Sequence, residues 1–216
     1  MGLLRGKLSI KNLTRLYEEN ATNDRVLVID SENVPYQQYI PNAHIIAKSR
    51  GIQADVQGDL DEKLSTIEDE SFEMILCTGL LEHVPEPQRF INDLHRILKP
   101  GGKLIVHASA VYCYHEGPND FFHFTPFSFK LLFSKWSSIT IRGSSQPFET
   151  IAILLQRILF QCEVKYKLVR LSVEILCLVL PKLDRFIGKQ YTTLNRNIGT
   201  EIDSMMPSNI QAVAIK

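Results

Sequence analysis

One stretch of the sequence, residues 72–108, predicts a strand, a helix and a second strand in direct succession. Residues 72–77 form a short apolar run that is typical of a buried strand. The residues 99–102, Lys-Pro-Gly-Gly, can end a helix, and the apolar run at 103–108 predicts the next strand. Such a unit is a parallel crossover, so we expect a mostly parallel α/β sheet. The helix is indicated by Pro85–Pro87 at its start and by one apolar stripe: Phe90, Ile91, Leu94, Ile97 and Leu98.

Similar patterns extend along the rest of the chain. Apolar residues at helical spacing predict an opening helix over residues 8–20 and a helix over about 126–136. Two strongly apolar helical stretches follow at 148–160 and 167–180. Apolar runs bounded by turn residues predict further strands at 26–29, 43–47, 54–56, 138–142 and 210–215.

At 216 residues, the chain is long enough for one sizeable core and does not require two domains. We expect a single α/β domain with a Rossmann-like, mostly parallel sheet of seven strands and helices on both faces. Its parts are an N-terminal helix, a core sheet, a helical insertion and a last strand, at residues 1–24, 25–142, 143–207 and 208–216.

Composition excludes several functional classes. Lys and Arg together number 24, as do Asp and Glu, so no overall basic field attracts nucleic acid. The N-terminal segment lacks the apolar core of a signal peptide, and charged residues interrupt every run that could cross a membrane. A cytoplasmic location is expected, with attachment to the inner face of the membrane as an alternative. The four cysteines are scattered without metal-ligand spacing, and Cys77 and Cys177 are expected to act as small buried hydrophobes in a reducing compartment.

The stretch SFEMILCTGLLEHVPEPQRFINDLHRILKPGGKLIVHAS resembles the class I S-adenosylmethionine-dependent methyltransferases. It is most similar to the small-molecule branch, whose fourth strand runs into an "EHV" turn and whose fifth follows "LKPGG". The likeness covers about residues 25–140 and the closing strand, and it includes GDLDEKL and YHEGPNDFFHFTPFSFKLLF. The family loop after the fifth strand reads close to "HxxPxDYxRFT", and this chain carries His115, Pro118, Asp120, Phe121, His123, Phe124 and Thr125 there.

The resemblance implies that S-adenosylmethionine binds across the carboxyl ends of the first four strands. The first loop would hold the methionine part of the cofactor, an acid after the third strand the adenine, and the segment after the fourth strand its other side. A solvated turn aspartate remains the alternative for Asp59. The cofactor-binding positions carried over in this way are Asp30, Ser31, Glu32, Asp59, Leu60, Cys77, Thr78 and Gly79.

Two positions depart from the family pattern. The glycines of the first loop are replaced by Asp30 and Glu32, whose side chains occupy space where backbone approaches the ligand. The acid that usually binds the ribose hydroxyls is absent from residues 47–50, Ala-Lys-Ser-Arg, and basic side chains cannot accept those hydrogen bonds. These departures predict weakened or lost cofactor binding and a degenerate motif.

On the acceptor side, the resemblance points to His115 and Asp120 as catalytic candidates. The imidazole of His115 could serve as a general base, with Glu116 as a weaker substitute. The alternative is that His115 and Asp120 only hold their loop through hydrogen bonds. Glu82 and His83 are expected to cap the following helix. An aromatic cluster is expected to form core and pocket wall: Phe121, Phe122, Phe124, Phe127 and Phe129.

The helical insertion permits two interpretations. Its second helix is apolar nearly all round, which favours burial on the sheet or in a homodimer. The alternative is a lid or a peripheral membrane contact through residues 151–187, since basic residues flank the apolar ones. The first helix has an apolar stripe of Ile151, Leu154, Leu155, Ile158, Leu159 and Cys162.

Two functional hypotheses follow. The first is an S-adenosylmethionine-dependent methyltransferase that acts on a small molecule, such as a saccharide or a lipid-linked intermediate. The second is a catalytically inactive relative that binds a partner through its apolar insertion. The residues that distinguish them are those of the first loop, Asp30–Glu32, together with residues 47–50.

Overall fold

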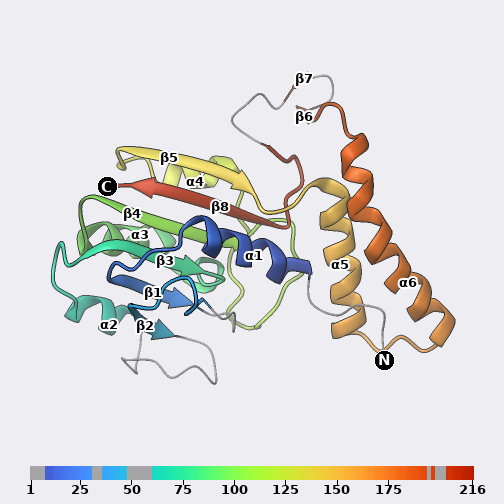
Figure 1. Cartoon of the computed structure of the whole chain (residues 1–216), viewed down its shortest axis with the longest axis horizontal. Helices are drawn as coiled ribbons and strands as arrows, with labels where there is room; N and C mark the ends of the chain where they lie inside the picture. The colour runs from blue at the N-terminus through green and yellow to red at the C-terminus, as the bar shows by residue number, and fades with distance from the viewer. Residues whose placement is uncertain (1–7, 31–35, 48–59, 194–195, 198–202) are drawn as a thin grey trace.

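The structure is a computed structural model that describes residues 8–30, 36–47, 60–193, 196–197 and 203–216 (Figure 1). The helices are α1 (Leu8–Glu19), α2 (Leu60–Thr66), α3 (Pro87–Ile97), α4 (Pro126–Leu132), α5 (Pro147–Gln161) and α6 (Lys167–Val179), with 3₁₀ helices η1 (Leu81–His83) and η2 (Leu180–Phe186). The strands are β1 (Val26–Asp30), β2 (Ala43–Ala47), β3 (Phe72–Thr78), β4 (Leu98–Ser109), β5 (Ser138–Gly143), β6 (Tyr191–Thr193), β7 (Arg196–Asn197) and β8 (Asn209–Ile215).

The main sheet has the strand order β2-β1-β3-β4-β8-β5. Neighbouring strands from β2 to β4 pair in parallel, and β8 pairs antiparallel with both β4 and β5. The predicted Rossmann-like, mostly parallel sheet is therefore confirmed. Six strands form it in the described part of the chain, where seven were expected. The strand expected at 54–56 lies outside the described residues, and β6 and β7 form a separate pair.

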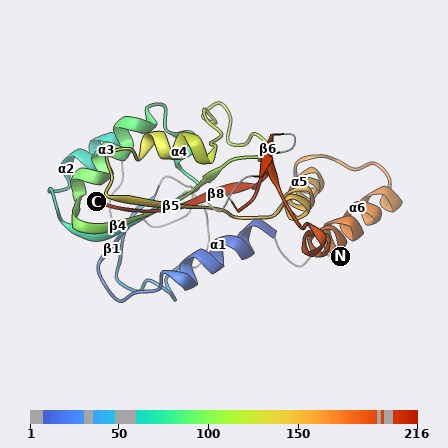
Figure 2. The same cartoon turned by 90° about the horizontal axis from the view of Figure 1, so that it is seen from above.

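Helices cover both faces of this sheet. Figure 2 shows α2, α3 and α4 on one face and α1 on the other. Successive strand residues point to opposite faces, so Leu27 and Ile29 join one apolar cluster while Val26 and Val28 join the other. The first cluster packs beneath α3 and the second beneath α1. The alternation of apolar side chains along the strands therefore gives the sheet one apolar core on each face.

The segment after α3 differs from the prediction in where its strand begins. β4 starts at Leu98, directly after the helix, rather than at Lys103. Glu73 of β3 faces the four residues 99–102, so the predicted turn is a bulge within the strand. A Cβ on Gly102 would lie 2.8 Å from the carbonyl oxygen of Lys99, which explains why a glycine is needed there. The expected stripe of α3 is buried throughout.

Two further predictions need correction near α4. This helix ends at Leu132 instead of continuing to about residue 136. It starts with a capping box in which the Thr125 side chain accepts a hydrogen bond from Ser128 N and the Ser128 side chain bonds the Thr125 backbone. Only part of the predicted aromatic cluster is core: Phe124 and Phe129 are buried, whereas Phe121, Phe122 and Phe127 are exposed.

The helical insertion lies between β5 and β8, as predicted. Figure 1 shows α5 and α6 side by side at the end of the molecule toward which the parallel strands point, with α6 on the outer side. α5 is tied to α1, because Leu8 N donates to Gln156 Oε1 over 2.8 Å and Asn12 Nδ2 donates to Glu149 Oε1 over 3.2 Å. The expected burial of the second helix on the sheet is wrong: α6 packs on α5 and η2, and it buries Glu174 and Cys177 alone.

Candidate active site at the carboxyl ends of β3 and β4

The chain leaves β3 through a sharp turn at Gly79. Cys77 and Thr78 are fully buried, and Gly79 has a φ of +60°, a conformation that glycine adopts without strain. Its N–H donates to the carbonyl oxygen of His107 on β4 over 2.8 Å. The turn therefore directs the chain into η1 at the edge of the sheet where parallel strands end.

η1 places two buried polar side chains at this edge. Glu82 and His83 are 1% and 2% exposed. Glu82 Oε1 accepts hydrogen bonds from Ser109 N over 3.3 Å and from Ser109 Oγ over 2.8 Å. His83 Nδ1 lies 2.9 Å from the carbonyl oxygen of Asn119. The Glu82 side chain therefore holds the end of β4, and His83 holds the loop that follows it, residues 110–125.

The expected capping role of Glu82 and His83 is wrong. The N-cap of α3 is Glu86, which makes no side-chain cap bond. The backbone of Glu82 also serves the loop, since its carbonyl oxygen accepts from Phe121 N over 3.0 Å and from Phe122 N over 3.2 Å. The sequence does carry a signal for this role. Glu82 and His83 follow directly after a parallel strand, and the carboxyl ends of parallel strands gather at the edge of the sheet where ligands bind.

The structure brings His115 and Asp120 together within the same loop. Asp120 Oδ2 accepts a hydrogen bond from the backbone N–H of His115 over 2.8 Å. The same oxygen lies 3.5 Å from His115 Nδ1 and 3.5 Å from His123 Nε2. The Asp120 side chain is 3% exposed, so its carboxylate orders the loop from inside. Asp120 is therefore placed to position His115.

The ring of His115 has one bound and one available nitrogen. Nδ1 lies 3.3 Å from the carbonyl oxygen of Cys113. A carbonyl oxygen only accepts, so this contact assigns the proton of the neutral ring to Nδ1 and leaves Nε2 basic. The ring meets those of His83 and Tyr112 edge-on, with centroid distances of 4.9 and 5.3 Å.

Burial lowers the pKa of His115, and the carboxylates of Glu82 and Asp120 oppose that shift. Desolvation is the larger effect, so the pKa lies below its ordinary value and the imidazole stays neutral at neutral pH. A neutral imidazole with a basic Nε2, close to carboxylates that would stabilise its cation, has the properties of a general base.

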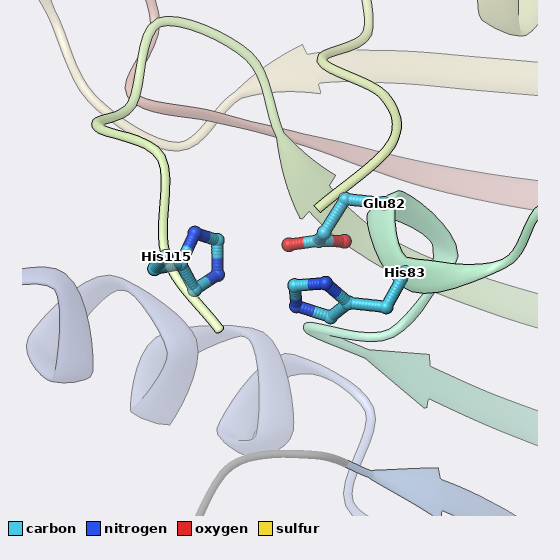
Figure 3. A group of neighbouring side chains, drawn as sticks. All are labelled: Glu82, His83 and His115. Carbon is cyan, nitrogen blue, oxygen red and sulfur yellow. The ribbon is translucent and has the colours of Figure 1, made fainter. Parts of the chain in front are cut away.

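Three side chains converge in this site (Figure 3). Glu82, His83 and His115 each offer one ligand atom, and these atoms lie within 4.8 Å of one another. Glu82 Oε2 is buried and has no hydrogen-bond partner among the described residues. Two imidazoles and a carboxylate are a donor set that divalent transition metals accept, so this cluster could hold one. Spacing in the sequence did not indicate it, because His115 comes from a separate loop.

The cofactor side is described in part. Asp30 at the end of β1 pairs in register with Thr78 of β3, so these two carboxyl ends meet at the edge where ligands bind in such sheets. Thr78 Oγ1 lies 3.1 Å from the Tyr17 hydroxyl, so the side chain of Thr78 is held against α1. Leu60 begins α2 and is half-buried.

The remaining positions of the predicted cofactor site lie outside the described residues. These are Ser31, Glu32, Asp59 and the basic segment at 48–50. The two departures from the family pattern therefore stay predictions.

A family model described as "Methyltransferase domain" matches residues 13–106, which run from α1 into β4. This match, together with the solved structures of the same fold, supports a class I S-adenosylmethionine-dependent methyltransferase family for the chain. The resemblance drawn from the sequence is thereby confirmed.

Curated relatives match over short segments. The ubiquinone biosynthesis O-methyltransferase of Xanthomonas oryzae pv. oryzae (strain PXO99A) is 37% identical over 67 residues, 28% of this chain and 27% of that protein. The enzyme of the same name from Coxiella burnetii (strain Dugway 5J108-111) is 48% identical over 44 residues, 20% of this chain and 19% of that protein. The chain thus matches about a quarter of these relatives' length or less.

Solved structures agree in fold. An S-adenosylmethionine-dependent methyltransferase from Archaeoglobus fulgidus superposes with a TM-score of 0.59 at 14% identity, covering 98% of this chain and 96% of that chain. The phosphoethanolamine N-methyltransferase 2 of Haemonchus contortus gives 0.53 at 14% identity, covering 95% and 52%. At such identities the likeness shows the fold, and the site must be argued from its own residues.

Proposed function

We propose that this chain binds S-adenosylmethionine and transfers its methyl group to a small molecule. The observation that carries the proposal is His115, held with a basic Nε2 beside the carboxyl ends of β3 and β4. The match to a methyltransferase-domain model supports the reaction class, and the O-methyltransferases among the curated relatives favour an oxygen atom as the acceptor.

In this proposal, S-adenosylmethionine, when bound, would supply a methyl group on a positively charged sulfur, with a neutral thioether as the leaving group. His115 Nε2 accepts the proton of the acceptor as the acceptor's lone pair forms its bond to the methyl carbon. The imidazolium that results is stabilised by the carboxylates of Glu82 and Asp120, whose charges act on His115. Asp120 acts as a positioning residue through the His115 backbone. Orientation of the acceptor supplies much of the remaining rate.

The narrower acceptor class that we propose is a saccharide or a lipid-linked intermediate. Support comes from the contact between the loop that follows β4, residues 110–125, and the apolar insertion. Arg157 of α5 lies with its guanidinium 5.2 Å from the centre of the Tyr112 ring, and its Nε is 3.4 Å from Cys113 Sγ. An acceptor with a polar head and an apolar tail could therefore contact both His115 and the insertion.

Calorimetric titration of the purified chain with S-adenosylmethionine and S-adenosylhomocysteine tests the proposal. We expect both to bind, and Asp59→Ala to weaken binding by about tenfold or more because one hydrogen bond to the adenine is lost. Glu68→Ala, an exposed acidic residue beyond α2, is the matched control and should bind like the wild type. Absence of binding at millimolar cofactor would reject the enzyme and favour the alternative of an inactive relative that binds a partner.

A further inference from the structure

The sides of α6 are reversed relative to an ordinary surface helix. Its inward side buries Glu174, which pairs with Arg170 over 3.2 Å, and Cys177. Its outward side is apolar, whereas a surface helix normally turns its apolar stripe inward. The exposed apolar residues of α6 are Leu168, Val169, Leu171, Ile175, Leu176, Leu178 and Val179, each 43–77% exposed.

The neighbouring elements of the insertion also expose apolar side chains. Ile151, Ile158 and Phe160 of α5 are 37%, 46% and 52% exposed, and Phe186 at the end of η2 is 70% exposed. The stripe predicted on α5 is thus partly outward-facing. Apolar surface gathered in this way marks a contact with another molecule or a membrane.

The charge of the insertion distinguishes between a contact with another molecule and a contact with a membrane. Residues 147–186 contain six basic and four acidic residues, although the whole chain has 24 of each sign. Three of the four acids serve internal contacts: Glu149 accepts from Asn12, Glu174 pairs with Arg170, and Asp184 accepts the backbone N–H groups of Phe148 and Glu149 over 2.8 Å each. The insertion is therefore apolar and basic on a chain with no net charge.

Basic and aromatic side chains stand together just before α6 and at the end of η2. Lys165 Nζ lies 5.6 Å from the centre of the Tyr166 ring, and Arg185 Cζ lies 4.7 Å from the centre of the Phe186 ring. Tyr166 and Phe186 are 63% and 70% exposed. Aromatic and basic side chains around an apolar face suit the boundary between lipid headgroups and acyl chains.

The helices are too short to cross a bilayer. α5 has 15 residues and α6 has 13, and none of the helices in the described part of the chain is long and apolar enough to span a membrane. Figure 2 shows the pair beside the sheet, with α6 as its outer helix. A contact with lipid would therefore lie along the surface.

We propose that the α5–α6–η2 insertion, residues 147–186, docks on an anionic lipid surface with the outward face of α6 among the acyl chains. A second copy of the chain fits this face less well, because a symmetric contact would bring the basic residues of the two insertions together. Anionic headgroups complement these basic residues, because a negatively charged lipid surface attracts them. This proposal is independent of the methyl-transfer activity.

Flotation of the whole chain with vesicles tests the apolar face. We expect the wild type to float with phosphatidylcholine vesicles that contain phosphatidylglycerol. The double variant Leu168→Glu/Ile175→Glu should lose at least about tenfold in partitioning, because two inserted apolar side chains become charged. The matched control is Phe127→Glu/Leu131→Glu on α4, where both residues are equally exposed, and it should float like the wild type.

The basic residues around the apolar face are tested separately. Lys165→Gln and Lys167→Gln should each lower partitioning about fivefold, and added salt should reduce the difference. Lys135→Gln, exposed beyond α4, should have no effect. Unchanged circular dichroism and thermal midpoints establish that the variants fold.

Three outcomes would overturn the proposal. The first is failure of the wild type to float with anionic vesicles. The second is equal flotation with phosphatidylcholine alone, which would exclude an anionic surface. The third is a dimer in sedimentation that Leu168→Glu/Ile175→Glu dissociates without any vesicle binding, which would assign the face to a second copy.

Discussion

The candidate active site and the helical insertion both reverse the usual distribution of polar and apolar side chains, in opposite directions. The site buries Glu82, His83 and Asp120 at the end of the sheet. The insertion exposes large apolar side chains of α6 and buries Glu174. Burying polar groups and exposing apolar groups each cost free energy unless a partner offsets them.

The two regions differ in how much of that cost the chain itself offsets. Glu82 accepts hydrogen bonds from Ser109 at the end of β4, and Asp120 accepts one from His115 in the loop that follows, so the site is held largely by internal contacts. One oxygen of each, Glu82 Oε2 and Asp120 Oδ1, has no hydrogen-bond partner among the described residues. The outward face of α6 has no comparable internal compensation. A preorganised set of polar groups at the site and a surface for an extended partner on α6 are the expected consequences.

The largest effect is expected from His115→Ala. Loss of the general base should lower kcat by about 10²–10⁴-fold, while the free energy of unfolding changes little. Single-turnover methyl transfer, followed with an acceptor found by screening, measures this. In the wild type, kcat/KM should fall in acid with an apparent pKa below 6.5, because burial lowers the pKa of His115.

His95→Ala provides the control, since His95 is also half-buried but lies on α3 against Trp136. Its kcat should stay near that of the wild type. An unchanged kcat in His115→Ala would show that His115 only holds its loop. The buried polar groups would then have a structural role and no catalytic one.

A smaller effect is expected from acid. Burial lowers the pKa of His107 from 6.5 to about 4, so the unfolded chain binds a proton at a pH where the folded chain does not. Stability contributed by neutral His107 is therefore present above pH 6.5 and is lost as the pH falls toward 4. The loss is at most about 3 kcal/mol.

Urea unfolding across this pH range measures that loss. In His107→Leu the dependence on pH should be flatter, since the buried imidazole is removed and Nδ1 has no hydrogen-bond partner among the described residues. An identical pH dependence in the variant would assign acid sensitivity to other groups.

The smallest effect is expected on the insertion. Ile175→Ala should change the free energy of unfolding by less than about 0.5 kcal/mol, because the side chain is 46% exposed. Ile153→Ala is the matched substitution at a site that is 1% exposed on α5, and it should cost about 2–5 kcal/mol. Comparable losses at both positions in thermal unfolding would show that the face of α6 is buried in solution.

Local patterns predicted much of the fold. The β3–α3–β4 unit followed from an apolar stripe with proline at one end and glycines at the other, because these residues act on their own backbone. The bulge at residues 99–102 did not follow, since it depends on how β4 pairs with β3. The length of α4 was also missed, because apolar residues beyond Leu132 pack on the core without being helical.

Within the candidate site, the family resemblance indicated His115 and Asp120, and the structure shows the contact between them. The sequence did not indicate that Glu82 and His83 join them, because an acid and a histidine before a helix also fit a cap. These residues meet because η1 and the loop that follows β4 lie together at one edge of the sheet. That arrangement depends on the order of the strands, which no short motif encodes.

By itself, the sequence determined the alternation of strands and helices, the parallel core and the position of the apolar insertion. Periodicity specifies these because each element must bury one face. Only the tertiary structure decided that Glu82, His83 and His115 converge and that α6 turns its apolar side outward. Both depend on contacts between segments far apart in the chain, so the physical cause is the packing of whole elements rather than the preference of any one of them.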